Sequence, residues 1–179
     1  GATYLATPRY DDPVPAPARD SDVPVDTGDG RLLTAVVRFN QLWTCRNIGV
    51  NSRGTAGFPD RTACEWLALN LSGARATLAQ RGRIFDDDPT DAYSFYFPSL
   101  AINGQGHVAM AFSGGSASTF VGAYCTGRLR TDTANTMRPV TLLRDGDDRY
   151  VHTGNDAYRR NRWGDYSATM LDPSDDLTF

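Results

Sequence analysis

The sequence predicts an all-β protein made of repeated four-stranded antiparallel units, about two and a half blades of a β-propeller. Its charged residues give the first indication. All 18 basic residues are arginine, and 20 of the 21 acidic residues are aspartate. Lysine and glutamate favour exposed helix positions, whereas aspartate favours caps and turns. Together with 17 glycines and 10 prolines, this balance favours strands joined by many turns.

Short β-like runs alternate with turn residues from Arg31 onward, which is the second indication. No segment has a convincing helical stripe, because the best candidate, residues 74–83, contains Gly82 and lies among expected strands. The expected strands are Leu32–Phe39, Leu42–Val50, Ala63–Leu71, Ala76–Phe85, Phe95–Ile102, His107–Ser113, Phe120–Thr126, Val140–Leu143 and Tyr166–Leu171, and a further strand begins at Leu177.

A repeated hairpin pattern is the third indication. Residues 96–110 (YFPSLAINGQGHVAM) and 165–179 (DYSATMLDPSDDLTF) align without a gap at an offset of 69 residues. Asn103 then matches Asp172 at the start of the turn, and residues 34–44 (TAVVRFNQLWT) form a weaker copy with a shorter turn. Propeller blades commonly repeat every 40–50 residues or so. The spacings of 63–69 residues in this chain suit blades with long outer loops.

Such units bury their sheet faces only when several of them pack together. A propeller closes with about four to eight blades, and residues 31–179 supply about two and the start of a third. We therefore expect the polypeptide to continue beyond Phe179, or other subunits to complete the ring. Residues 1–30, rich in proline and aspartate, are expected to form an arm or linker, or a connection between strands. A β-sandwich with coincidentally similar hairpins is the alternative fold.

Charge and hydropathy limit the classes of partner. The formal net charge of −3 gives no reason to expect nucleic acid. The sequence contains no apolar run of about 18 residues, so no membrane span is expected. A Gly-x-x-x-x-Gly-Lys phosphate loop cannot occur without lysine, and the Gly-x-Ser-x-Gly elbow of serine hydrolases is missing. A glycan or a protein is the expected partner.

The cysteines bear on the cellular compartment. Cys45, Cys64 and Cys125 form no Cys-x-x-Cys pair, so the ligand spacing of a zinc or haem site is lacking. A disulfide between Cys45 and Cys64, in adjacent expected strands, would close a loop of about 20 residues and stabilise the fold by about 3 kcal/mol. Such a disulfide favours an oxidising, extracellular location. Three buried free thiols are the alternative.

Four stretches of the chain resemble known proteins. They are residues 48–54 (IGVNSRG), 61–71 (RTACEWLALNL), 95–114 (FYFPSLAINGQGHVAMAFSG) and 161–179 (NRWGDYSATMLDPSDDLTF). In these the chain resembles secreted bacterial β-propeller proteins of sialidase-like architecture, mostly without assigned activity. The Arg-Trp-Gly-Asp-Tyr-Ser motif is the most specific part. The resemblance implies a propeller and export but no catalytic residues, and the chain lacks the Ser-x-Asp-x-Gly-x-Thr-Trp box of true sialidases.

The densest group of candidate ligand-binding residues comprises Arg160, Arg162, Trp163, Asp165 and Tyr166. Arginine binds carboxylates in a bidentate manner, and tryptophan stacks on sugar faces or other rings. A sialidase-type site would combine several arginines with a tyrosine nucleophile. The alternative is that Trp163 packs between blades while Arg162 and Asp165 secure a loop.

Two aspartate-rich turns raise calcium as a cofactor. Asp86 and Asp88 lie in the stretch FDDDPTD, and Asp145 and Asp147 lie in RDGDDR. Calcium takes about six to eight oxygen ligands, and aspartate supplies them readily. Neither stretch matches the EF-hand loop, however, and solvated hairpin corners are the alternative.

Glycoside hydrolysis commonly requires two carboxylates at a defined separation. The 20 aspartates allow many pairs and select none of them. Glu65, the one glutamate, lies in an expected strand, where it is either a pocket residue or a salt-bridged surface residue. The catalytic residues of a hydrolase therefore stay unknown from the sequence.

Three functions follow from these patterns. An extracellular propeller module that binds a glycan or protein partner is the expected one, because the repeats lack a recognisable catalytic set. A sialidase-like glycoside hydrolase or lyase is the alternative indicated by the Arg-Trp-Gly-Asp-Tyr cluster. A structural subunit of an extracellular assembly, with partner chains covering open strand edges, is the second alternative.

Overall fold

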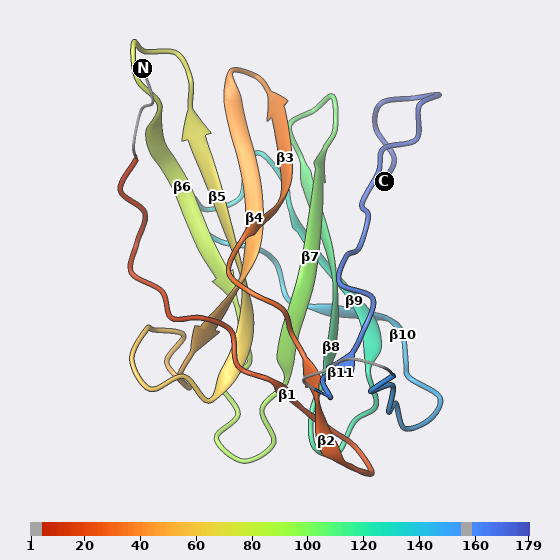
Figure 1. Cartoon of the computed structure of the whole chain (residues 1–179). Helices are drawn as coiled ribbons and strands as arrows, with labels where there is room; N and C mark the ends of the chain where they lie inside the picture. The colour runs from red at the N-terminus through yellow and green to blue at the C-terminus, as the bar shows by residue number, and fades with distance from the viewer. Residues whose placement is uncertain (1–4, 155–158) are drawn as a thin grey trace.

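The computed structural model describes residues 5–154 and 159–179, and in these ranges the chain is all-β, with eleven strands in three sheets (Figure 1). Two sheets have four strands each and follow the order of the sequence. The third sheet joins two N-terminal strands to a short strand near the C-terminus. The described ranges contain no helix long and apolar enough to cross a membrane. The expectation of an all-β fold with antiparallel sheets is confirmed.

The first four-stranded sheet is an antiparallel meander that lies close to the strands expected from the sequence. Its strands are β3 (Leu32–Arg38), β4 (Gln41–Val50), β5 (Arg61–Asn70) and β6 (Thr77–Ile84). The β3–β4 hairpin has a two-residue loop, Phe39 and Asn40, with φ angles of 50° and 59°. Two successive left-handed residues form the type I′ turn that matches the twist of paired strands.

The second four-stranded sheet has the same order of strands. They are β7 (Ser94–Ile102), β8 (Val108–Gly115), β9 (Gly122–Arg128) and β10 (Thr141–Arg144). Asn103 closes the β7–β8 turn, because its Oδ1 accepts hydrogen bonds from the amides of Gln105 at 3.0 Å and His107 at 2.9 Å. This side-chain cap is the reason why asparagine is favoured at the start of such a turn.

The C-terminal segment, residues 163–179, departs from the sequence prediction. It runs beside β7 in Figure 1, but it forms no strand at Tyr166–Leu171 or from Leu177, so both expected strands are wrong. Its contact with β7 is made by side chains: the Ser167 hydroxyl donates to the Phe97 carbonyl at 2.7 Å. Because a hydroxyl takes the place of a backbone amide at this edge, no regular ladder of hydrogen bonds forms.

The third sheet was not expected from the sequence. Its strands are β1 (Ala16–Ala18), β2 (Ser21–Asp26) and β11 (Asn161–Arg162). β2 pairs antiparallel with β1 and parallel with β11. Ala16 and Val25 are buried in an apolar cluster with Tyr96 and Phe97. Part of the proline- and aspartate-rich N-terminal region therefore packs into the fold as a small sheet.

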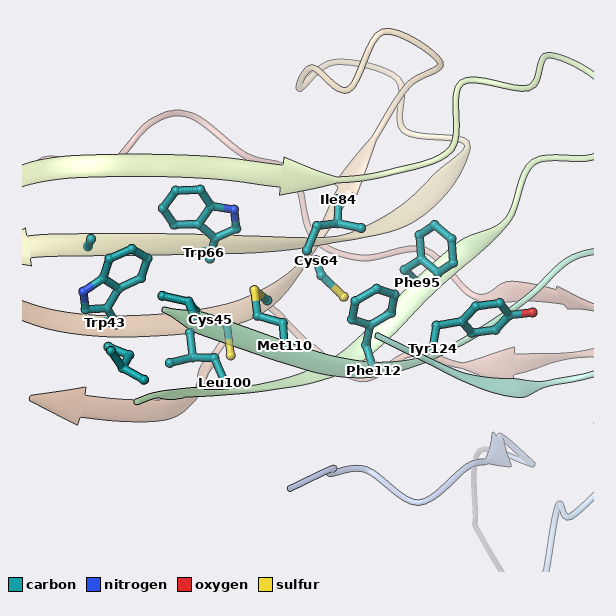
Figure 2. Close-up of a cluster of buried hydrophobic side chains, with 13 residues drawn as sticks. Trp43, Cys45, Cys64, Trp66, Ile84, Phe95, Leu100, Met110, Phe112 and Tyr124 are labelled. Atoms are coloured by element: carbon teal, nitrogen blue, oxygen red, sulfur yellow. The ribbon is translucent and has the colours of Figure 1, made fainter. Parts of the chain in front are cut away.

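The larger apolar core lies between the two four-stranded sheets (Figure 2). Its members alternate along the strands, so that each sheet turns one apolar face towards the other. Trp43 and Trp66 stack on the first sheet with ring centroids 5.4 Å apart. On the second sheet, Phe95 and Phe112 meet edge to face at 5.2 Å. This core fixes how the two sheets sit on each other.

All three cysteines lie in the described ranges and are free thiols, so the disulfide expected between Cys45 and Cys64 is not formed. The register explains this, because Cys45 lies opposite Trp66 while Cys64 lies opposite Asn47. Such diagonal neighbours are about 7–8 Å apart, beyond the roughly 4.4–6.8 Å between the Cα atoms of a disulfide. Burial raises the pKa of the Cys45 thiol to about 12 and that of Cys64 well above its usual value.

Glu65 lies at the centre of a buried ion-pair group on the other face of the first sheet. Its Oε2 accepts from Arg46 Nη2 at 2.6 Å, and its Oε1 accepts from Arg83 Nε at 3.0 Å. The Tyr10 ring covers Arg46, with the guanidinium carbon 3.7 Å from the ring centroid. Glu65 is therefore salt-bridged, as one expectation had it, but it is buried rather than on the surface.

Candidate ligand-binding site

The first segments of the three repeats lie side by side. β3, β7 and the C-terminal segment run in the same direction in Figure 1. At their C-terminal ends, Arg38 Nη1 donates to the Ile102 carbonyl at 3.0 Å and forms an ion pair with Asp176. The Gly104 amide donates to the Asp176 carbonyl at 2.7 Å. Equivalent parts of the three repeats therefore meet at this end of the sheets.

A cavity of about 200 Å³ lies at the other end, where these segments begin. We call it the first-strand cavity. Its lining consists of Asp26, Gly28, Asp29, Arg31, Leu33, Asn47, Phe97, Arg160, Arg162, Asp165 and Tyr166. Four of the five candidate residues expected from the sequence are among them. Phe97 and Tyr166 occupy matching positions of the repeat, 69 residues apart. The cavity thus forms where the repeats converge.

Each arginine of the first-strand cavity is paired with an aspartate that also lines it. The pairs are Arg31 with Asp29, Arg160 with Asp26 and Arg162 with Asp165. The hydrogen bonds between Arg31 and Asp29 hold the pKa of the Asp29 carboxyl below its usual value, and they raise the pKa of the Arg31 guanidinium. Because three guanidinium groups face three carboxylates, the lining offers many polar donors and acceptors without a net charge.

The backbone around the first-strand cavity adopts an uncommon conformation at several positions. Gly28, Phe97 and Asp165 have φ angles of 73°, 54° and 71°. A left-handed backbone at a residue other than glycine costs about 1–3 kcal/mol and is most frequent at binding and catalytic sites. At Gly28 a Cβ atom would lie 3.0 Å from Phe97 Cε1, so a larger residue would press on the ring. The close approach of these segments requires glycine there.

Asn47 holds the wall of the first-strand cavity together. Its buried side chain accepts a hydrogen bond from the Phe97 amide and donates one to the Thr27 carbonyl, both at 2.7 Å. It thereby ties β4 to β7 and to the loop that carries Asp29 and Arg31. Sequence reasoning missed Asn47, although an asparagine in the apolar strand LWTCRNIGV was a signal of a buried polar contact.

Trp163 differs from the other four candidate residues, because it does not line the first-strand cavity. It packs against the apolar cluster that contains Val25 and Phe97. Its Nε1 donates to Ser113 Oγ at 3.0 Å, and its ring meets Tyr150 edge to face at 4.7 Å. Trp163 therefore anchors the segment that carries Arg162 and Tyr166. Tyr166 itself is 67% exposed.

The aspartates proposed as calcium ligands cap turns. Asp86 accepts the Asp88 amide at 3.1 Å, and Asp88 accepts the Thr90 amide at 2.7 Å. Arg61 Nη1 donates to the main-chain carbonyls of both aspartates at 2.7 and 2.8 Å. Asp145 and Asp147 bind the Gly146 amide and the Arg144 guanidinium. In the described part of the chain, no three His, Cys, Asp or Glu residues gather to hold a metal.

Comparison with known proteins adds no assignment. No protein-family model matches the chain, and no curated protein matches its sequence. The function is therefore argued from the two observations above: a cavity where the repeats converge, and a lining of paired arginines and aspartates.

Replacing Asn47 by alanine is expected to lower the free energy of unfolding by about 2–6 kcal/mol, because two buried backbone groups lose their partner at about 1–3 kcal/mol each. Equilibrium unfolding in urea, followed by circular dichroism, measures this loss. Gln105→Ala, at an exposed side chain of the β7–β8 turn, is the control and should stay within about 0.5 kcal/mol. A loss below about 1 kcal/mol at Asn47 would contradict its proposed role.

Proposed function

We propose that this chain is part of an extracellular β-propeller module that binds a glycan, with one uncharged sugar ring held in the first-strand cavity. The observation that carries the proposal is the lining of that cavity. Three arginine–aspartate pairs and an exposed tyrosine ring surround a space of about 200 Å³.

Three features support the propeller. Two four-stranded antiparallel meanders follow each other along the chain, as successive blades do. The turns of the second and third repeats begin with residues at matching positions, Asn103 and Asp172, and each amide donates to a carbonyl across its turn, that of His107 in one and that of Thr178 in the other. The first segments of the repeats lie side by side, which is how the inner strands of neighbouring blades surround a central channel.

The chemistry of the lining favours a sugar over a free anion. Sugar hydroxyls both donate and accept hydrogen bonds, and each arginine–aspartate pair offers donors and acceptors together. An anion would have to compete with the aspartate that already binds each arginine. The exposed ring of Tyr166 provides an apolar face with a polar edge, against which a sugar ring can stack.

The size of the first-strand cavity favours a glycan over a protein partner. Pockets for drug-sized ligands enclose about 300–1,000 Å³, so the smaller volume suits a single ring. A stable protein partner would need a contact of about 800 Å² on this chain, far larger than the mouth of a small cavity. The extracellular location rests on the resemblance to secreted proteins alone, because the free thiols remove the disulfide argument.

The test is a glycan array screened with the purified chain, followed by calorimetric titration of the ligands found. Tyr166→Ala is expected to weaken binding at least about tenfold, which corresponds to about 1.4 kcal/mol. Phe58→Ala, at another exposed aromatic residue outside the first-strand cavity, is the matched control and should leave binding unchanged. An array without any bound glycan, or unchanged binding by Tyr166→Ala, would overturn the proposal.

A sialidase-like glycoside hydrolase or lyase is the second candidate. One observation favours it: Asp26, Asp29 and Asp165 line the same cavity as Tyr166, and glycoside hydrolysis commonly uses a pair of carboxylates. The glycans that bind on the array decide between the two candidates. Release of reducing sugar that is lost in Asp165→Asn would indicate a hydrolase, whereas binding without turnover indicates a module that only binds.

A further inference from the structure

A second cavity, of about 250 Å³, lies at the opposite end of the two four-stranded sheets from the first-strand cavity. Residues of β4, β6, the ends of β7 and β9, and the β3–β4 and β7–β8 turns line it. The lining includes Phe39, Trp43, Gln80, Gly106, Arg128 and Arg130. We call it the Arg128 cavity.

Arg128 brings a positive charge into this cavity without a direct carboxylate partner in the described residues. Its side chain is buried, and its Nη atoms donate to the Gln80 amide oxygen at 2.8 Å and the Asp132 carbonyl at 2.9 Å. A longer bond goes to the Thr133 carbonyl at 3.4 Å, and all three acceptors are neutral. The Asp132 carboxylate binds Arg138 instead, at 2.8 Å. A buried charge with only neutral partners is costly, so its retention calls for a reason.

The guanidinium of Arg128 also has an unused donor. Its Nε is buried and has no hydrogen-bond partner in the structure. Buried polar atoms without a partner are rare in folded proteins, and each calls for an explanation such as an absent ligand or water. The Asp132 carboxylate attracts Arg128 without bonding to it directly, and together with the orphan donor this leaves the guanidinium incompletely paired, as expected where an anionic group completes the site.

Arg130 places a second guanidinium at the Arg128 cavity. Its side chain passes over Gly106, where a Cβ atom would lie 3.1 Å from Arg130 Cδ, and its guanidinium carbon lies 5.9 Å from the centroid of the Phe39 ring. Within the described ranges, no aspartate or glutamate forms a salt bridge with Arg130 or Arg128. The cavity therefore carries an excess of positive charge, unlike the first-strand cavity, where each arginine has an aspartate.

Two aromatic rings are also part of the wall. Phe39 is 54% exposed at the mouth, and the buried Trp43 lies deeper, with its Nε1 bound to Gln41 Oε1 at 3.1 Å. Aromatic faces favour contact with a flat or ring-shaped apolar body. A ligand that suits both parts of the lining carries an anionic group on a small ring.

We propose that the Arg128 cavity binds a hexuronate residue, with its carboxylate on the guanidinium groups of Arg128 and Arg130 and its ring against Phe39 and Trp43. A carboxylate matches the planar fork of a guanidinium. The volume again suits one sugar ring. The proposal is independent of the glycan proposed for the first-strand cavity, because the two cavities share no lining residue.

The experiment is a titration of the whole chain with galacturonate, its methyl ester and galactose, followed by tryptophan fluorescence and calorimetry. Trp43 is a built-in reporter, because it lines the cavity. We expect galacturonate to bind, and the uncharged ester and galactose to bind at least about tenfold more weakly. Raising the salt concentration should weaken galacturonate binding, because Arg130 is exposed and salt screens interactions between exposed charges.

Variants inside and outside the Arg128 cavity test where the ligand binds. Arg130→Gln is expected to weaken galacturonate at least about tenfold, and Arg128→Met at least as much. Arg149→Gln, at an exposed arginine outside the cavity, and Tyr166→Ala should both leave galacturonate binding unchanged. Equal binding of acid and ester, unchanged binding by folded Arg130→Gln, or tighter binding of inorganic phosphate than of galacturonate would each overturn the proposal. Loss of galacturonate binding in Tyr166→Ala would also overturn it, since that would assign the acid to the other cavity.

Discussion

Replacing Glu65 by alanine is expected to lower the free energy of unfolding by about 3–5 kcal/mol, the usual cost of removing one partner from a buried ion pair. Glu65 is 1% exposed and bridges Arg46 and Arg83 on the outer face of the first sheet. Without the carboxylate, the buried guanidinium of Arg46 keeps the Tyr10 ring above it but has no counterion. Equilibrium unfolding in urea measures the loss.

Two controls separate burial from mere ion pairing. Asp147→Ala breaks the ion pair between Asp147 and Arg144, whose side chains are 80% and 75% exposed respectively. This substitution should cost less than about 1 kcal/mol. The triple variant Arg46→Met/Glu65→Leu/Arg83→Met removes every charge of the group and should recover most of the stability, because apolar residues of similar size replace such groups well. A loss below about 1 kcal/mol in Glu65→Ala would show that the group is dispensable.

The eight strands of the two larger sheets were predictable because their signals are local. Alternating apolar residues mark each strand, and residues such as Asn103 mark the turns between them. The C-terminal segment carries the same pattern, but the Ser167 hydroxyl meets β7 where a ladder of amides was expected. The third sheet was missed because its local hairpin β1–β2 lies in a region rich in proline and aspartate, and because β2 gains its other partner, β11, more than a hundred residues later. No local pattern contains that pairing.

Part of the candidate site could be predicted from the sequence. The Arg-Trp-Gly-Asp-Tyr cluster is contiguous, and four of its residues meet in one cavity. Asp26, which pairs with Arg160, and Asp29, which pairs with Arg31, come from residues 1–30, whose composition indicated an arm, a linker or a connection between strands. The pairs Arg31–Asp29 and Arg162–Asp165 are local in the sequence, whereas the pair Arg160–Asp26 depends on the pairing of β2 with β11. The Arg128 cavity could not be predicted because its lining comes from strands and turns that are far apart in the sequence.

The two cavities differ in charge although both contain arginine. In the first-strand cavity every guanidinium is matched by a carboxylate of the same lining. In the Arg128 cavity the direct hydrogen-bond acceptors of Arg128 are uncharged. Because an anion gains most where a positive charge has no counterion, the two ends of the same pair of sheets should select different sugars, an uncharged one and an acidic one.

Replacing Trp66 by alanine is expected to lower the free energy of unfolding by about 3–5 kcal/mol, the cost of emptying a large aromatic site in a packed core. Trp66 is fully buried and stacks on Trp43 (Figure 2). On β6 its neighbour across the strands is Gly82, where a Cβ atom would lie 2.5 Å from the Trp66 indole nitrogen. The indole thus fills the space that glycine leaves open.

That complementarity gives a sharper measurement than the single substitution. Gly82→Ala should cost about 1–3 kcal/mol, because the added methyl group collides with the indole. In Trp66→Phe/Gly82→Ala the smaller ring makes room for that methyl group, so the double variant should lose less than the sum of the two single variants. Urea unfolding of the wild-type protein, Trp66→Phe, Gly82→Ala and the double variant gives the coupling energy. Additivity within about 0.5 kcal/mol would mean that the two residues do not share one space, and that something other than contact with Trp66 requires glycine at position 82.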